Sequence, residues 1–301
     1  MGHVITKGRI VEAWLAAIDY LEHHDGRYRN LILEVDTADN VTPQDLKVIA
    51  EVNKALGNHG RTSVLTVAGT IFPQALYKRV GASELAEHFL RIMSTAKKRG
   101  TWGTYAMRLM RRPGREPNSV INPLEMLIGK LSRAASPEGK AVVSNYELGV
   151  MDAGDVEDDL ALCDVPLYSP EHDAAMMRNQ PCLMHLSFKL VSKGEVELTA
   201  IYRSHYYAER ALGNLIGLRQ LMNYVAEQSG VRAGRLACIS TDANLDLFSW
   251  GNAKQRTAAL QAVRAAATAA DPAVSASAAV RAATAAPPLV VRRRAPTHTG
   301  A

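Results

Sequence analysis

The segment that most constrains the fold lies at residues 181–214, where two stretches of alternating apolar and polar side chains flank a turn. Apolar residues occupy every second position from 184 to 190 and one face of 196–203, which is the period of a half-buried β-strand. The turn between them includes Gly194, which is free to adopt positive φ. The pattern therefore predicts a β-hairpin that leads into a helix.

The two ends of this hairpin carry reactive side chains. Cys182 directly follows Pro181, and Arg203 and Ser204 follow the return strand. Because antiparallel strands return to the edge where they began, we expect the thiol to lie beside the guanidinium. Two interpretations of Cys182 stay open: a buried cysteine that acts as a small hydrophobic residue, or a nucleophile whose pKa the neighbouring cation lowers. Arg203 and Ser204 together are suited to bind a phosphate.

The helix after the hairpin carries a polar residue next to its apolar face. Asn214 lies three residues after Ala211 and four before Leu218, so its amide points close to the side that packs. A buried amide needs hydrogen-bond partners. Asn214 is therefore either a capping or helix-contact residue, or a residue that presents its donor and acceptor to a ligand.

Pro181-Cys182, Arg203-Ser204 and Asn214, in this order and spacing, resemble the signature of thymidylate synthase and its hydroxymethylase relatives. The resemblance covers roughly residues 140–250. It implies an α+β fold with a large mixed β-sheet flanked by helices, in a homodimer packed through sheet faces. It also implies transfer of a one-carbon unit from the co-substrate 5,10-methylenetetrahydrofolate to C5 of a pyrimidine nucleoside monophosphate.

The resemblance implies a role for each matched residue. Cys182 would be the catalytic nucleophile that adds to C6 of the pyrimidine ring, which makes C5 nucleophilic. Asn214 would read the base, and Asp242, in a segment that resembles the family's sugar-binding loop, would support the nucleotide pocket. The phosphate would be bound by Arg203, Ser204 and Lys140, the last from a strand that in the family reaches across the dimer.

Several positions depart from the family pattern. Gly139 and Lys140 replace two arginines, Tyr206 replaces an aspartate involved in folate binding, and Asn244 and Asp246 replace a histidine and a tyrosine of the sugar loop. These departures keep three interpretations open: a methylase, a nucleotide hydroxymethylase, and a catalytically lost protein that binds nucleotide or acts as a scaffold. They also leave open whether the base of the substrate is uracil or cytosine, and whether its sugar is ribose or deoxyribose.

Other candidate residues carry a weaker signal. Tyr105 and Arg108 faintly resemble a glycine-tyrosine-arginine segment of the family, but an aromatic core corner with a solvated arginine accounts for them as well. His205 is either a proton carrier or a structural histidine. Glu84 and Glu87 lie in the general region of the family's catalytic glutamate, and the sequence does not choose between them.

Hydrophobic periodicity and capping residues predict the remaining elements. Helices are expected over 9–23, from an N-cap at Thr42 to about Leu56, after Pro73, over 83–98, and from Pro123 through Leu131. Strands are expected over 30–35, 63–67 and 140–144, and an irregular acidic insertion over 148–180.

Composition bounds the remaining possibilities. The chain of 301 residues has a net charge of +5, but seven Lys and Arg against one Asp fall in residues 253–301, so the folded part is near neutral and indicates no polymeric nucleic acid partner. We therefore expect a thymidylate synthase-like domain at 1–252 and an Ala/Arg-rich tail at 253–301, helical to about residue 270 and largely disordered beyond. The lack of a long apolar run and of a signal-peptide core predicts a cytoplasmic protein with no membrane partner. Three scattered cysteines without a CxxC pair suggest neither a disulfide framework nor a metal site.

Overall fold

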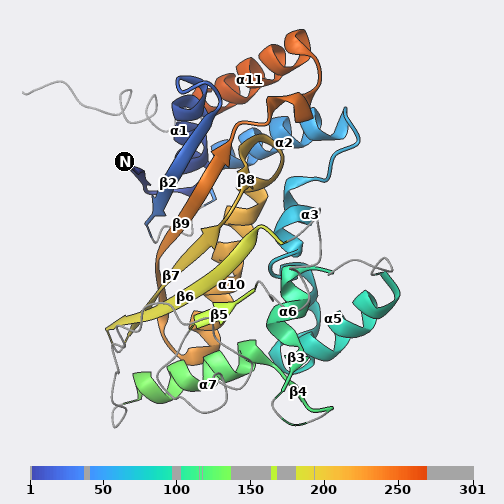
Figure 1. Cartoon of the computed structure of the whole chain (residues 1–301), viewed down its shortest axis with the longest axis vertical. Helices are drawn as coiled ribbons and strands as arrows, with labels where there is room; N and C mark the ends of the chain where they lie inside the picture. Colours follow the sequence, from blue (N-terminus) through green and yellow to red (C-terminus); the bar gives the residue numbers. More distant parts are fainter. Residues whose placement is uncertain are drawn as a thin grey trace, which may run out of the picture.

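The structure is a computed structural model that describes residues 2–36, 41–96, 103–114, 116, 118–136, 164–167, 181–192 and 194–269. A mixed β-sheet forms its centre, with the strand order β1-β2-β9-β7-β6-β5 and with β8 paired to β9 (Figure 1). The strands of this sheet are β1 (His3–Lys7), β2 (Arg27–Val35), β5 (Asp164–Pro166), β6 (Leu183–Ser192), β7 (Glu195–Tyr202), β8 (His205–Tyr206) and β9 (Arg232–Asn244). A separate two-stranded ribbon is formed by β3 (Arg112–Pro113) and β4 (Val120–Ile121).

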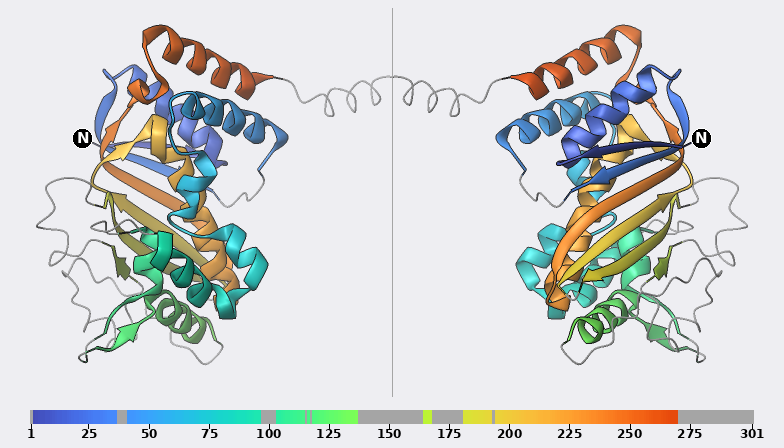
Figure 2. Two further views of the ribbon diagram at one scale, coloured as in Figure 1. Left: turned by 90° about the vertical axis from the view of Figure 1, so that its right-hand side faces the viewer. Right: turned by 90° about the vertical axis from the view of Figure 1, so that its left-hand side faces the viewer.

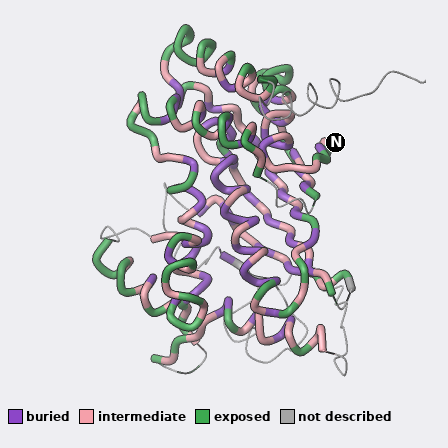
Figure 3. Tube along the Cα trace, turned by 180° about the vertical axis from the view of Figure 1, so that it is seen from behind, coloured by how far each residue is buried: buried purple, intermediate pink, exposed green. Residues whose placement is uncertain are grey.

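Helices cover one face of the sheet. The longest, α10 (Leu212–Ser229), contacts β7 and β9 on one side and α1, α3 and α7 on the other, and it is largely buried (Figure 3). The α-helices around it are α1 (Ile10–Glu22), α2 (Pro43–Gly57), α3 (Val64–Gly69), α4 (Gln74–Val80), α5 (Ala82–Ala96), α6 (Tyr105–Met110), α7 (Pro123–Ala135) and α11 (Ala253–Thr268). A π-helix, η1 (Tyr207–Ala211), leads into α10, and a 3-10 turn, η2 (Leu247–Trp250), precedes α11. No described helix lies over the opposite face (Figure 2).

This arrangement confirms the expected α+β class, with a large mixed sheet flanked by helices. The hairpin predicted from the alternating pattern is confirmed as well, because β6 and β7 pair antiparallel with Leu186 opposite Ala200 and Phe188 opposite Leu198. The expected inward face of β7 is buried at every second residue. Two irregularities were not expected, since the register shifts between Leu183 and His185 and again between Leu190 and Ser192.

The helices expected near 9–23, 43–56, 83–98 and 123–131 are also confirmed. At the start of α2, the Thr42 side chain accepts a hydrogen bond from the Asp45 main chain and the Asp45 carboxylate accepts one from the Thr42 main chain. This capping box, together with Pro43 at the first helical position, explains why the helix begins where the sequence predicted.

The strand expected at 63–67 is wrong. Ser63 caps the helix α3 instead, with its hydroxyl accepting from the Thr66 main chain at 3.3 Å. The β-branched residues of this segment favour a strand locally, but α3 packs closely on α10 at Gly213 and Gly217. A Cβ at Gly217 would lie 2.7 Å from the carbonyl oxygen of Ala68, so the glycines create the groove that receives this helix.

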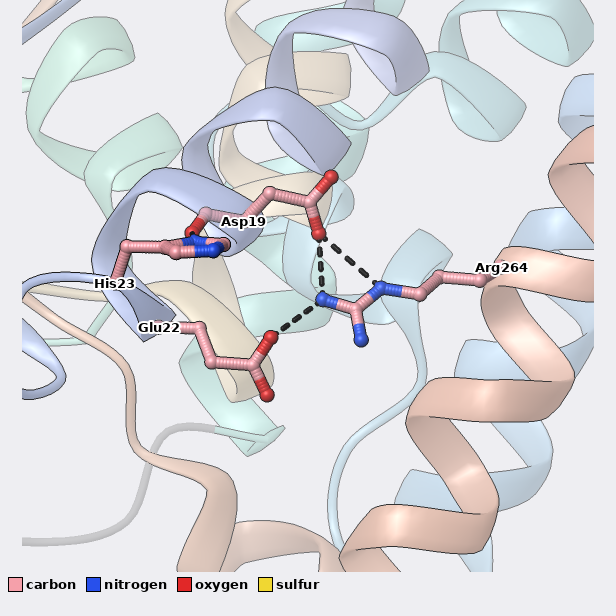
Figure 4. Close-up of polar contacts among 4 residues, drawn as sticks. All are labelled: Asp19, Glu22, His23 and Arg264. Atoms are coloured by element: carbon pink, nitrogen blue, oxygen red, sulfur yellow. Dashed lines mark hydrogen bonds and ion pairs between the residues drawn. The ribbon is translucent and has the colours of Figure 1, made fainter.

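The last described helix, α11, packs against α2 at the top of the molecule in Figure 1. Its Leu260 and Val263 are buried. Arg264 reaches across to α1, where its guanidinium contacts Asp19 at 2.6 Å and Glu22 at 2.5 Å (Figure 4). Residues 253–268 are thus helical as expected, and they dock on the body. The domain boundary at residue 252 remains a prediction, and the chain from residue 270 lies outside the described residues.

Other expectations also fall outside the described residues. Lys140 and the strand expected at 140–144 are among them, as is most of the acidic insertion at 148–180. Within that insertion, residues 164–166 form a regular strand, β5, which pairs antiparallel with β6. This short piece of order differs from the irregular segment that was expected.

Candidate active site

The corner between β6 and β7 brings Cys182 and Arg203 together, as the hairpin register predicted. The main-chain N–H of Arg203 donates to the carbonyl oxygen of Cys182 at 3.0 Å, and the Arg203 guanidinium hydrogen-bonds with the Cys182 thiol. The Arg203 carbonyl is held in turn by the Thr241 hydroxyl on β9, which donates to it at 3.0 Å. Ser204 follows in the bend between β7 and β8 and is half-buried.

Two opposing effects act on the pKa of the Cys182 thiol. Burial raises the pKa, while the guanidinium of Arg203 and, to a smaller extent, that of Arg210 lower it. Burial is the larger effect, so the pKa lies above its ordinary value. The lowering of the thiol pKa by Arg203 that the sequence suggested is therefore present, but the enclosure of the sulfur outweighs it. Cys238 is fully buried and its pKa rises to about 12, which fits a small hydrophobic residue of the core.

Tyr105 holds the main chain at the candidate nucleophile. Its hydroxyl oxygen accepts hydrogen bonds from the N–H groups of Cys182 at 3.0 Å and Leu183 at 3.1 Å. Tyr105 is the first residue of α6, whose N-cap Thr104 accepts from the Met107 main chain. Burial raises the pKa of Tyr105 to about 12. The weak sequence signal at Tyr105 thus marks a residue in direct contact with the Cys182 main chain.

A second arginine lies at the same corner. Arg210, on η1, acts electrostatically on both Cys182 and Tyr105. Its guanidinium pairs with Glu209 at 2.9 Å, and Glu209 also lies 3.7 Å from Arg61. Sequence reasoning missed Arg210 because no motif marks it and because the π-helical turn that aims it has no recognisable sequence signature.

Asn214 is buried and belongs to a chain of hydrogen bonds. Its Nδ2 donates to Nε2 of His205 at 3.0 Å, and His205 Nδ1 lies 2.9 Å from the hydroxyl of Ser240. The Ser240 hydroxyl lies 3.0 Å from the phenol oxygen of Tyr207. Burial lowers the pKa of His205 to about 3, so the ring is neutral at physiological pH. A neutral, enclosed ring is a structural histidine and not a proton carrier at that pH.

Tyr202 connects the region around Cys182 to the hydrogen bonds of Asn214 and His205. It is the last residue of β7 and lies opposite Leu183, the neighbour of Cys182. Its ring stacks on His205 with 4.0 Å between the ring centroids and 3° between the ring planes. Cys182, Arg203 and Asn214 are therefore gathered around one end of β7.

Asp242 lies on β9 and is held by an ion pair. Its two carboxylate oxygens accept from Nε and Nη2 of Arg27 on β2, at 2.7 Å and 2.8 Å. Asp246, at the position where the family has a tyrosine, is buried and accepts from the main-chain N–H of Ala208 at 2.8 Å. Its carboxylate thus stabilises the start of η1, and burial raises its pKa.

The described residues contain no group of three or more His, Cys, Asp or Glu side chains placed to hold a metal ion. Within the same residues, no helix is both long enough and apolar enough to cross a membrane.

Most of the site residues predicted from the sequence lie on consecutive elements around one end of the sheet: Cys182, Arg203, Ser204 and Asn214. Asp242 lies on the adjacent strand.

The fold and this corner define a class: an α+β protein whose mixed sheet presents a cysteine beside an arginine, followed by a helix with a buried asparagine. No protein-family model matches the chain. A segment of 70 residues is 36% identical to a protein named "Putative thymidylate synthase" in Methanosarcina barkeri and to one in Methanosarcina acetivorans. It is 34% identical to a protein of the same name in Methanococcoides burtonii.

The matched segment covers 23% of this chain and 32% of each relative, so the chain spans about a third of the length of the curated relatives it matches. These similarities support a distant thymidylate synthase-like relationship, as the motifs of the sequence indicated.

Proposed function

We propose that the protein transfers a one-carbon unit from 5,10-methylenetetrahydrofolate to C5 of a pyrimidine nucleoside monophosphate. The observation that carries this proposal is the contact of the Arg203 guanidinium and main chain with Cys182, on a hairpin that also leads to the buried amide of Asn214. The distant relationship to thymidylate synthase-like proteins supports the same chemistry.

In this proposal Cys182 is the nucleophile. Its thiolate adds to C6 of the pyrimidine as the C5=C6 π bond opens, and the carbanion formed at C5 attacks the methylene carbon as the bond from that carbon to a folate nitrogen breaks. C5 then loses its proton, and the thiolate later leaves C6. Burial raises the pKa of Cys182, so Arg203 and Arg210 have a defined electrostatic task, which is to stabilise the thiolate against that burial. Tyr105 keeps the main chain at the thiol in place through its two hydrogen bonds.

In the same proposal the nucleotide is bound by residues from several parts of the chain. Arg203 and Ser204, with Lys140, bind the phosphate, because a guanidinium and a hydroxyl supply charge and direction. Asn214 reads the base edge, and Asp242 supports the nucleotide pocket from β9, where its ion pair with Arg27 fixes its carboxylate. The folate is a second substrate, and the residues that bind it are not assigned.

A second candidate function is nucleotide binding without turnover, as in a scaffold protein that has lost catalysis. The raised pKa of Cys182 and the replacement of the family's sugar-loop residues by Asn244 and Asp246 favour it. Release of tritium from C5-tritiated pyrimidine nucleotides separates the candidates, because only an enzyme that adds a thiolate to C6 labilises that hydrogen. Dihydrofolate as product then indicates a methylase, and tetrahydrofolate indicates a hydroxymethylase.

We also propose that the protein is a homodimer packed through the sheet face over which no described helix lies (Figure 2). The strand register aligns Val4, Ile32, Ile239 and Ile201 in one row across β1, β2, β9 and β7. Val4 is 50% exposed, and the other three are partly buried. An apolar row of this kind, on a face that none of the described helices covers, is suited to burial against a second copy. Sedimentation of the 32.7 kDa chain at micromolar concentration tests this, and a clean monomer contradicts it.

A further inference from the structure

The π-helical turn η1 is held at its start by side chains from distant parts of the chain. The indole Nε1 of Trp14 on α1 donates to the carbonyl oxygen of Tyr207 at 2.8 Å. The main-chain N–H of Ala208 donates to the carboxylate of Asp246, also at 2.8 Å. Trp14 and Asp246 are both fully buried. A π-helical turn is rare and is found frequently at functional sites. The main chain of this turn is therefore fixed immediately before the two charged residues that follow.

Glu209 is the first of these two residues, and both of its carboxylate oxygens have partners. Oε1 lies 2.9 Å from Nη2 of Arg210. Oε2 lies 3.2 Å from the buried hydroxyl of Ser249 and 3.7 Å from Nη1 of Arg61. The Glu209 side chain is 11% exposed, against 42% for Arg210. A half-exposed guanidinium is thus paired with an enclosed anion that other residues hold in place.

Ser249 links this carboxylate to the contact that fixes the main chain. Its hydroxyl lies 2.9 Å from Oδ2 of Asp246, while Oδ1 of the same carboxylate accepts from Ala208. A hydroxyl has one hydrogen, so Ser249 shares it between the carboxylates of Asp246 and Glu209. One buried pair, Asp246 and Ser249, therefore holds both the main chain of the π-helical turn and the side chain of Glu209.

Arg210 carries its charge to the thiol. The guanidinium acts electrostatically on Cys182 and on Tyr105, as Arg203 does on Cys182 from the hairpin. An arginine side chain is long, and one that is half exposed samples many rotamers unless a partner fixes it. Consecutive residues of a helix do not normally face each other, so the pair of Glu209 with Arg210 depends on how the arginine side chain bends. The enclosed carboxylate supplies the fixed point for that bend.

We propose that Glu209, anchored by Ser249 and Arg61, is a positioning residue that holds the guanidinium of Arg210 beside Cys182. The hairpin then supplies one cation to the enclosed sulfur and the π-helical turn supplies a second, and cations favour the thiolate over the thiol. This inference rests on the proposed function for the reaction that the thiolate carries out. The coupling between the glutamate and the arginine is a property of the chain without any substrate.

The test is a double-mutant cycle on the reactivity of the thiol. The rate at which iodoacetamide alkylates Cys182 is measured across pH in the full chain, with peptide mass spectrometry to identify the site. Arg210→Gln is expected to move the midpoint of this pH profile upward by roughly 0.5–1 pH unit, because the thiolate loses a nearby cation. Glu209→Gln should also move it upward. Adding Arg210→Gln to Glu209→Gln should then move it by less than about 0.2 unit, because the arginine has already lost its place.

Three results overturn the inference. An unchanged profile in Arg210→Gln means that this arginine does not act on the thiol. Equal shifts for Arg210→Gln with and without Glu209→Gln mean that the arginine stays beside the thiol without the carboxylate. A downward shift in Glu209→Gln means that the carboxylate draws the guanidinium away from the sulfur. Should Glu209→Gln not fold, Ser249→Ala takes its place in the cycle, and it should reduce the shift caused by Arg210→Gln.

Glu195→Gln is the matched control. Glu195 also pairs with an arginine, since its carboxylate lies 3.0 Å from Nη2 of Arg232, and its side chain is 24% exposed. It is the first residue of β7, whereas Arg203 follows the last, so this ion pair lies at the far end of the strand from Cys182. The control should leave the pH profile of alkylation at its wild-type midpoint, which separates the positioning effect from a general change of charge.

Release of tritium from C5-tritiated pyrimidine nucleotides, measured on the same variants, separates this inference from the proposed function. Coupled pH profiles in a chain that labilises no C5 hydrogen support the positioning by Glu209 and overturn the proposed function. Tritium release by a wild type whose cycle shows no coupling overturns the positioning by Glu209 and leaves the proposed function standing.

Discussion

The main-chain N–H of Arg203 donates to the carbonyl oxygen of Cys182 at 3.0 Å, while the side chain of the same arginine reaches the thiol. The main-chain bond fixes the start of the Arg203 side chain beside Cys182, and the side chain itself brings the guanidinium to the sulfur. Any chemistry at Cys182 therefore takes place beside a positive charge.

Replacing the thiol tests the proposed nucleophile. Cys182→Ala should abolish exchange of the C5 hydrogen while the nucleotide still binds, because thiolate addition is the step that makes C5 reactive. Cys182→Ser should behave in nearly the same way, since a serine hydroxyl without an adjacent base is a poor nucleophile at neutral pH. Tritium release and calorimetric binding measure the two effects separately. Wild-type exchange in Cys182→Ala would place the nucleophile elsewhere.

Removing the guanidinium should change both binding and thiol reactivity. Arg203→Ala is expected to raise the nucleotide dissociation constant by about 10- to 150-fold, the loss of one charge-assisted hydrogen bond of roughly 1.5–3 kcal/mol. It should also raise the pKa of Cys182 further, because burial then acts with less opposition. Alkylation of Cys182 by iodoacetamide, followed by peptide mass spectrometry across pH, measures this shift. An unchanged pH profile would mean that Arg203 does not act on the thiol.

The buried histidine should make stability depend on pH. The pKa of His205 is about 3 in the folded chain, against about 6.5 when unfolded, so only the unfolded state takes up a proton in between. Its contribution is therefore complete above pH 6.5 and is lost as the pH falls, by about 1.4 kcal/mol per pH unit. Urea unfolding of the wild type and His205→Gln at several pH values measures the difference in slope. Equal slopes would show that His205 titrates normally.

The contact between α3 and α10 should not tolerate a methyl group. Gly217→Ala places a Cβ 2.7 Å from the carbonyl oxygen of Ala68, so we expect a loss of about 1–3 kcal/mol in the free energy of unfolding. Gly129→Ala is the matched control on α7, where the nearest atom would be 3.6 Å away, at the end of the flexible Arg133 side chain. That change should stabilise the helix by about 0.5–1 kcal/mol. Thermal or urea unfolding measures both substitutions. An equal effect of the two on the free energy of unfolding would contradict the close packing of α3 on α10.

The docking of α11 should depend on its apolar residues more than on its ion pairs. Arg264 and both of its carboxylate partners are more than a third exposed, so Arg264→Ala should cost no more than about 1 kcal/mol. Leu260 is buried, and Leu260→Ala should cost about 2–5 kcal/mol. Urea unfolding at low and high salt measures the free energy of unfolding of both variants. A larger loss of stability for Arg264→Ala than for Leu260→Ala would mean that the ion pairs in Figure 4 contribute most to the docking of α11.

Short-range sequence patterns determine much of this protein. The period-two alternation defined the hairpin at β6 and β7, and its antiparallel return placed Arg203 beside Cys182. The Thr42 cap with Pro43 located the start of α2. These features follow from the sequence because each depends on residues that are near neighbours along the chain or are paired by a single turn.

The tertiary structure decided what depends on distant contacts. Tyr105 and Cys182 are 77 residues apart, and their hydrogen bond arises because the fold brings the start of α6 next to the residue that precedes β6. The segment at 63–67 became a helix because the glycines of α10 receive it, against its local β preference. The pKa of Cys182 rises because the fold encloses the sulfur, and burial is a property of the whole fold that no local motif encodes.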